Sequence, residues 1–182
     1  MFDFKSASYF RTGMDLASKE EYGEAVFYFS KAISSEPNNP WYHAYKGEAL
    51  IRAVFKEKKS DQEPLDGEDL IKLKSGIKEI DRAFKLGEIP LSQKSMFIMV
   101  KAIALWIKDG TLEAEKALEE IDSDELKKID PERYEIFKKF SERLSGLNRK
   151  FEVINRTIAE ITREKERQQR IKNLRIDVSK YD

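Results

Sequence analysis

The chain has 182 residues, which suits one domain or one domain with an appendage, and its 34 basic and 34 acidic residues balance. The net charge therefore favours neither nucleic acid nor a membrane surface as the partner. Charged residues make up 37% of the chain, whereas glycine and proline number only 8 and 5. This composition is typical of long solvated helices and predicts an all-α fold.

Cysteine is absent, which excludes disulfides and thiolate metal sites. The first residues lack the basic start and apolar run of a secretory signal peptide. The most apolar segment, residues 96–107, contains Lys101 and is much shorter than the roughly 20 apolar residues that a membrane span needs. We therefore expect a cytoplasmic protein with no membrane partner.

Residues 6–39 carry the pattern of two helices around a short break at residues 19–22. Small residues stand where the two helices must approach closely, and large ones fill the spaces between them. A proline ends the second helix. In chain order these positions are Tyr9, Gly13, Leu16, Tyr22, Ala25, Phe29, Ala32 and Pro37.

This order resembles the tetratricopeptide (TPR) repeat over the length of one 34-residue unit. It departs from the pattern of the family only at Thr12, where the family prefers leucine. The resemblance implies stacked helical hairpins, an α-solenoid, in which the first helix of each repeat lines a concave groove. It also implies a binding scaffold rather than an enzyme.

A second repeat is predicted from Pro40, with Asn39 as the N-cap of its first helix. Gly47 follows Gly13 by 34 residues, the length of one unit. Residues 56–68 are polar and contain a proline and a glycine, so they predict an exposed loop inserted between the two helices. The small and large apolar positions then resume at Gly76, Ile80 and Ala83.

A third repeat is predicted around Ala102 and Ala114, which are separated by the same interval as Gly13 and Ala25. Residues 109–111, Asp-Gly-Thr, predict a tight turn between its helices. Together the three units form a predicted TPR-like domain, residues 1–128. The apolar side chains of the last helix keep helical spacing at Ala114, Ala117, Leu118 and Ile121.

After residue 128 the pattern changes, and residues 129–182 are predicted to form a helical extension with a loose tail. Asp130 and Pro131 predict the start of its helix, and Gly146 either breaks that helix or weakens it by about 1 kcal/mol. We expect the part before Gly146 to fold back on the repeats and the part after it to pair with a second copy. An apolar heptad seam comprises Phe137, Phe140, Leu144, Leu147, Phe151, Ile154, Ile158 and Ile161, of which the last four are the predicted oligomerisation seam.

Few residues could carry catalysis. His43 is the only histidine, and no nucleophile elbow or glycine-rich phosphate loop accompanies it, so we interpret it as a polar residue lining a groove. Residues 119–125 are acidic, but Lys127 stands where a calcium loop needs glycine, and Asp122 or Ser123 is instead predicted to cap the next helix. The sequence therefore predicts no enzyme, no metal and no cofactor.

The TPR resemblance implies a peptide-binding groove whose side chains are mainly apolar and adaptable. For the tryptophan and tyrosine a place in the core is an equal alternative, and for the two later methionines the core is favoured. Chaperone-binding members present lysine and asparagine where this chain has Phe10 and Met14, so that partner class is not expected. The predicted groove residues are Phe10, Met14, Trp41, Tyr45, Met96 and Met99.

Three functions remain open from the sequence. The leading hypothesis is an adaptor or chaperone-like scaffold that holds a peptide or helix of a protein partner. The second is a self-assembly protein that forms a homodimer through the C-terminal coiled-coil seam. The third is a nucleic-acid or ribosome binder acting through residues 149–175, which hold nine basic and four acidic residues. Because the acids lie at helical pairing distances from the bases, a solvated helix face is favoured over this third function.

Overall fold

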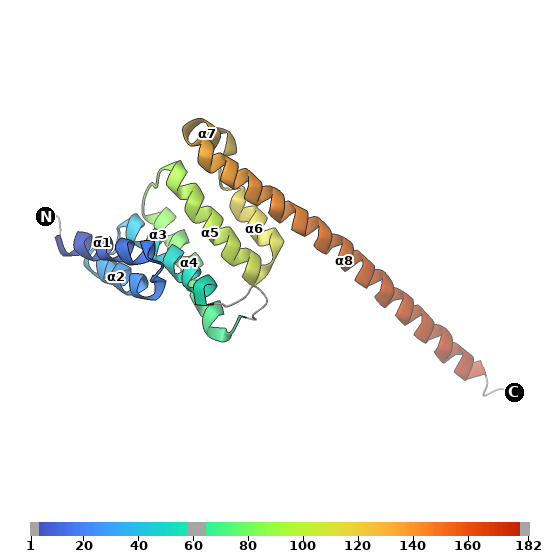
Figure 1. Cartoon of the computed structure of the whole chain (residues 1–182). Helices are drawn as coiled ribbons and strands as arrows, with labels where there is room; N and C mark the ends of the chain where they lie inside the picture. The colour runs from blue at the N-terminus through green and yellow to red at the C-terminus, as the bar shows by residue number, and fades with distance from the viewer. Residues whose placement is uncertain (1–3, 58–64, 179–182) are drawn as a thin grey trace. The chain divides into compact units, whose positions relative to one another are not determined.

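The structure is a computed structural model that describes residues 4–57 and 65–178. In these ranges every regular element is an α-helix, which confirms the all-α fold class (Figure 1). The helices in chain order are α1 (Phe4–Ser18), α2 (Tyr22–Ser35), α3 (Pro40–Glu57), α4 (Gly67–Leu86), α5 (Leu91–Asp109), α6 (Thr111–Leu118), α7 (Ser123–Ile129) and α8 (Pro131–Val178).

Helices α1 and α2 form the first helix pair, joined by a tight turn in which Glu20 has a positive φ of 61°. A Cβ atom built on Gly13 would lie only 2.6 Å from the ring carbon Cε1 of Phe29. The two helices can pack at this separation because Gly13 has no side chain. Ala25, Phe29 and Ala32, predicted as the contact positions of the second helix, are fully buried.

Helices α3 and α4 form the second helix pair, and here the backbones themselves meet. Asn39 caps α3 as predicted, since its Oδ1 accepts a hydrogen bond of 3.1 Å from the Trp41 N–H. A Cβ atom on Gly47 would lie 2.7 Å from the carbonyl oxygen of Gly76. The predicted equivalents of the first pair, Gly76 with Ile80 and Ala83, are all buried.

The connection between α3 and α4 contains the predicted inserted loop. The described part of that loop is helical at both ends, because α3 runs to Glu57 and α4 starts at Gly67. Asp66 caps α4 in a reciprocal capping box with Asp69. Residues 58–64 lie outside the described residues.

Helices α5 and α6 form the third helix pair, followed by the short α7. The predicted turn between them is present, and Gly110 adopts a φ of 96° there, which favours glycine. Ala102 and Ala114 are fully buried. The Asp122 side chain caps α7 by accepting a 2.9 Å hydrogen bond from the Glu125 N–H, as one of the two sequence alternatives predicted.

Packing follows the chain. Each helix from α1 to α5 contacts the next one, α3 also contacts α5, and α5 contacts α7 (Figure 1). One apolar cluster joins α1, α2 and α3 around Phe29, and a larger one joins α3, α4 and α5 around Leu73 and Phe97. The first helices of successive pairs, α1, α3 and α5, therefore have their side chains in two adjoining cores.

Helix α8 begins at Pro131, where the Asp130 side chain accepts a 3.1 Å hydrogen bond from the Arg133 N–H. It continues through Gly146 without a break. The chain divides into two compact units, Met1–Ser141 and Glu142–Asp182, so the division falls within α8 and after the predicted domain boundary at residues 128 and 129.

Most of the predicted oligomerisation seam lies outside the side chains that the structure describes, namely Phe151, Ile154 and Ile158. Its remaining member, Ile161, is 51% exposed. The backbone of residues 176–178 is helical, and the last four residues of the predicted loose tail lie outside the described residues. Across the described ranges, no helix combines the length and the apolar character that crossing a bilayer requires.

Candidate functional site

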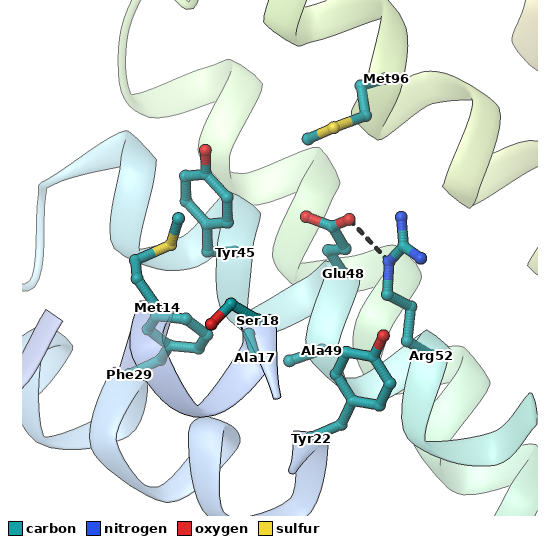
Figure 2. A pocket seen from close by; sticks show the side chains of 10 residues that line it. All are labelled: Met14, Ala17, Ser18, Tyr22, Phe29, Tyr45, Glu48, Ala49, Arg52 and Met96. Carbon is teal, nitrogen blue, oxygen red and sulfur yellow. Dashed lines mark hydrogen bonds and ion pairs between the residues drawn. The ribbon is translucent and has the colours of Figure 1, made fainter. Parts of the chain in front are cut away.

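A half-open cavity of about 300 Å³ lies in the first unit, where α1, α2, α3 and α5 meet. We name it the methionine cavity, because a methionine lines it on each of two helices. Figure 2 shows the side chains around it. Its lining consists of Met14, Ala17, Ser18, Tyr22, Phe29, Tyr45, Glu48, Ala49, Arg52 and Met96.

One face of α3 contributes the central part of this lining. Tyr45, Glu48, Ala49 and Arg52 recur at the three- and four-residue spacing that places helical side chains on one side. In Figure 2, Met96 lies across the cavity from this face, on a different helix. The cavity therefore requires α3 and α5 to be packed, and no single helix pair contains it.

Tyr45 is held by aromatic rings from four helices. Its ring centroid lies 5.5 Å from Phe10 and 6.2 Å from Phe29, on α1 and α2. It lies 5.2 Å from Phe97 on α5, edge to face, and stacks on Trp41 within α3 at 6.3 Å. Such ring pairs fix orientation as well as burying area. The wall that Tyr45 gives the cavity is therefore formed before any ligand arrives.

The polar end of the cavity is an ion pair within α3. Arg52 Nε donates a 2.7 Å hydrogen bond to Glu48 Oε1 (Figure 2). Burial by itself would lower the pKa of Arg52, but the charge and hydrogen bond of Glu48 raise it above its ordinary value. Burial, followed by the Glu48 charge, also raises the pKa of Tyr45, so its phenol is neutral at physiological pH. A mainly apolar cavity thus carries one fixed pair of charges, with the hydroxyl groups of Ser18, Tyr22 and Tyr45 also in its lining.

The structure brings together three of the six predicted groove residues. Met14, Tyr45 and Met96 line the methionine cavity from α1, α3 and α5. Phe10 and Trp41 are half-buried and pack against the apolar clusters, where each contacts the Tyr45 ring. Met99 is half-buried and does not line the cavity. Of the six predicted residues, three thus line the cavity, two pack against Tyr45, and Met99 lies outside the lining.

Sequence reasoning missed the other side chains of the cavity, above all Glu48 and Arg52. Both follow Tyr45 on the same helical face, three and seven residues later. Helical periodicity places both on the same side of α3 as Tyr45, but it does not distinguish a cavity-lining ion pair from a solvated one. For Tyr22 and Phe29 the sequence predicts only contacts between the first two helices.

The structure corrects the prediction for His43. The side chain lies fully buried in the core and does not line the methionine cavity. Its Nδ1 lies 2.6 Å from Glu79 Oε2 and its Nε2 lies 2.9 Å from the Pro37 carbonyl oxygen. A carbonyl oxygen only accepts hydrogen bonds, so Nε2 is the donor in the contact with Pro37. Lys46 Nζ donates to the other Glu79 oxygen at 3.1 Å. The prediction of a groove-lining histidine was wrong because the ring is buried against Glu79 of α4, which lies 36 residues away in the sequence.

The remaining polar clusters hold the helices together. Glu120, in the acidic run, accepts a 3.0 Å hydrogen bond from Lys101, and Asp122 caps α7. Among the side chains that the structure describes, no group of three or more histidine, cysteine, aspartate or glutamate residues could hold a metal ion.

No protein-family model, no curated protein and no solved structure matches this chain. The function must therefore be argued from the residues of the site.

Proposed function

We propose that this chain is a cytoplasmic, non-enzymatic protein-interaction module, an adaptor or chaperone-like scaffold. In this proposal its helix pairs stack as TPR-like repeats, and a groove along α1, α3 and α5 holds a peptide or helix of a protein partner. The methionine cavity is the part of the groove that receives an apolar side chain of that partner.

The observation that carries the proposal is the meeting of Met14, Tyr45 and Met96 at one half-open cavity. They come from three helices, and the TPR resemblance alone predicts them to line a groove. The burial of the small residues at the repeat positions, Ala25, Gly76 and Ala114, is further support.

The lining indicates the chemistry of the partner. Methionine side chains adapt to irregular apolar groups, whereas the ring-packed Tyr45 gives a rigid wall. The guanidinium of Arg52 has more donors than its bond to Glu48 uses, and its side chain is 45% exposed. We therefore expect a segment that inserts one large apolar side chain and offers Arg52 a carbonyl or carboxylate acceptor nearby.

The test compares two methionines of α5. Met96 lines the cavity and Met99 does not, although both are half-buried. A partner segment isolated with the intact protein from native lysate is made as a peptide, and its affinity is measured by calorimetry. Met96→Ala should weaken binding by about 1–2 kcal/mol, whereas Met99→Ala should change it by less than about 0.5 kcal/mol. Equal effects of the two substitutions would contradict the assignment of the cavity.

A second candidate function, self-assembly through α8, is favoured by two observations. The helix continues through Gly146, and Ile161 is 51% exposed on it. An exposed apolar residue that belongs to a heptad pattern favours pairing with a second helix. Light scattering should then find a homodimer for the full chain and a monomer after truncation at Gly146.

A matched pair of substitutions sharpens this second test. Ile161→Glu should dissociate the dimer, whereas Ala159→Glu, two residues away and outside the seam, should leave it intact. A full-length monomer at tens of micromolar would rule out self-assembly.

A further inference from the structure

A second half-open cavity, of about 430 Å³, lies against α2, α3 and α4 in the first unit. It shares no lining residue with the methionine cavity. We name it the basic cavity, because three of its side chains are cationic and one is acidic. Its lining consists of Val26, Ser30, Lys46, Leu50, Ser75, Lys78, Glu79 and Arg82.

The one acidic side chain of the basic cavity is already neutralised by its neighbours. Glu79 Oε1 accepts a hydrogen bond from Lys46 Nζ at 3.1 Å, and Oε2 lies 2.6 Å from the buried His43 ring. These contacts hold the pKa of Glu79 below its ordinary value although burial favours the opposite change. Both carboxylate oxygens of Glu79 are therefore already in contact with His43 or Lys46.

The other two cations have no such partner. Among the described side chains, neither Lys78 nor Arg82 makes an ion pair, and both are exposed. They lie four residues apart on α4, where like charges face each other on one side of the helix and repel. An anion held between them would relieve that repulsion.

We propose that the basic cavity binds the phosphate group of a phosphate monoester. A monoester carries nearly two negative charges at neutral pH, which matches the two positive charges of Lys78 and Arg82. The planar guanidinium of Arg82 can donate two parallel hydrogen bonds to phosphate oxygens, and Lys78 supplies a point charge. The Ser75 hydroxyl lies in the same lining and is a further donor.

The apolar part of the cavity lining favours binding of a phosphate monoester over binding of free phosphate. Val26 and Leu50 are half-buried in the cavity wall, and the volume of about 430 Å³ is larger than a bare phosphate ion needs. The organic part of the ligand therefore packs against these two side chains. A phosphodiester, with one negative charge on each phosphate, would pair with only one of the two cations.

The ligand chemistry has two sources, a small phosphorylated molecule or a phosphorylated side chain of a peptide. The probes are therefore free O-phosphoserine and a short phosphoserine peptide, each with its unphosphorylated serine counterpart, at constant ionic strength. The full chain is titrated at millimolar probe concentrations, and binding is followed by the NMR signals of the Arg82 side chain and the Ser75 amide. Saturable shifts are expected for both phosphorylated probes and for neither counterpart.

The source is read from the ratio of the two affinities. Roughly equal affinities identify a small phosphorylated molecule as the ligand. Binding of the phosphopeptide that is at least about tenfold tighter identifies a phosphorylated chain. Either ratio supports a phosphate site.

The variant test uses residues of one helix. Arg82→Gln and Lys78→Gln should each weaken binding about tenfold or more, because each removes a charged donor. Lys74→Gln removes an exposed lysine of α4 that does not line the cavity, and should change the affinity less than about twofold. Circular dichroism of the three variants should match that of the parent chain, since all three side chains are exposed.

Three results would overturn the proposal. One is the absence of saturable shifts with both phosphorylated probes. Another is equal binding of the serine counterparts. The third is an equal loss for Lys74→Gln and Arg82→Gln, because that would reflect the general charge of α4 and not a site.

Discussion

The first and second helix pairs carry glycine at the same repeat position, but the two glycines make room for different groups. A Cβ atom on Gly13 would meet the ring of Phe29, at 2.6 Å from Cε1. A Cβ atom on Gly47 would meet backbone, at 2.7 Å from the Gly76 oxygen. The Phe29 ring can rotate, or a mutation can replace it with a smaller side chain. The Gly76 carbonyl is part of the helix backbone and moves only if α4 moves. The same spacing in the sequence thus encodes a tolerant contact in one pair and an intolerant one in the other.

The largest effect is expected at the intolerant contact. Gly47→Ala should destabilise the fold by about 3 kcal/mol or more, because the new methyl group overlaps backbone and the Ile80 side chain. Urea unfolding followed by circular dichroism measures the loss. The control is Gly23→Ala in α2. A Cβ atom added there would meet no atom of another helix within 4 Å, so the change should be neutral or stabilising by up to about 1 kcal/mol. A loss below about 1 kcal/mol for Gly47→Ala would show that α3 and α4 separate easily.

A smaller effect is expected at the tolerant contact. Gly13→Ala should cost about 1–2 kcal/mol, and Phe29→Leu in the same chain should recover part of that loss by removing the ring atoms that the methyl group meets. The double-mutant cycle should therefore give a favourable coupling between the two substitutions. Additive losses would mean that the helices, and not the ring, respond to the added methyl group.

The two pairs should also differ in acid, because the second contains the cluster of His43, Lys46 and Glu79. Burial favours a raised pKa for Glu79, but the hydrogen bonds from His43 and Lys46 and their charges lower it below the ordinary 4.5. Folding lowers the pKa of this carboxyl group, so its ionised form stabilises the native state above pH 4.5. The stabilisation is lost as the pH falls through the pKa that Glu79 has in the folded protein.

Acid titration of the unfolding free energy measures this contribution. The parent chain should lose stability below pH 4.5 more steeply than Glu79→Gln, which has no carboxyl group to protonate there. The control, Glu88→Gln, replaces an exposed glutamate and should follow the parent curve. If the unfolding free energies of the parent chain and of Glu79→Gln fall in parallel as the pH is lowered, the cluster does not contribute to the loss of stability in acid.

The smallest effect is expected in the connection within the second pair. The residues between α3 and α4 include 58–64, which are polar and charged in sequence. Shortening this segment should change the free energy of unfolding by less than about 1 kcal/mol, because loop-closure entropy depends only weakly on length. A loss above roughly 2 kcal/mol would mean that the segment packs against the fold.

The positions at which helices touch could be predicted because they follow a local rule. Close approach of two helices requires glycine or alanine at a fixed interval, and that interval identifies Gly47, Gly76 and Ala102 from the sequence alone. The caps of α3 and α7 followed from residue type in the same way. Each of these predictions depends on residues within about one repeat.

The polar half of the methionine cavity and the place of His43 could not be predicted, because they depend on tertiary contacts. Glu48 and Arg52 are charged residues at a helical pairing distance, which the sequence does not distinguish from a solvated pair. Their place in a cavity depends on Met96, which is far along the chain. His43 is buried because Glu79 lies opposite it on α4. No spacing rule within one helix reports these contacts.

Lys101 has a consequence for how the helix pairs unfold. It lies on α5, is nearly buried, and bonds Asp81 of α4 at 2.8 Å and Glu120 beyond α6 at 3.0 Å. Removing the ammonium group from water offsets much of its attraction to the two carboxylates, so the net contribution of the cluster to stability is small. If the third pair detached from the second, however, the ammonium would lose a carboxylate while its neighbours remained folded. A partly unfolded chain is therefore disfavoured more strongly than a fully unfolded one, and the second and third pairs should melt as a single cooperative unit.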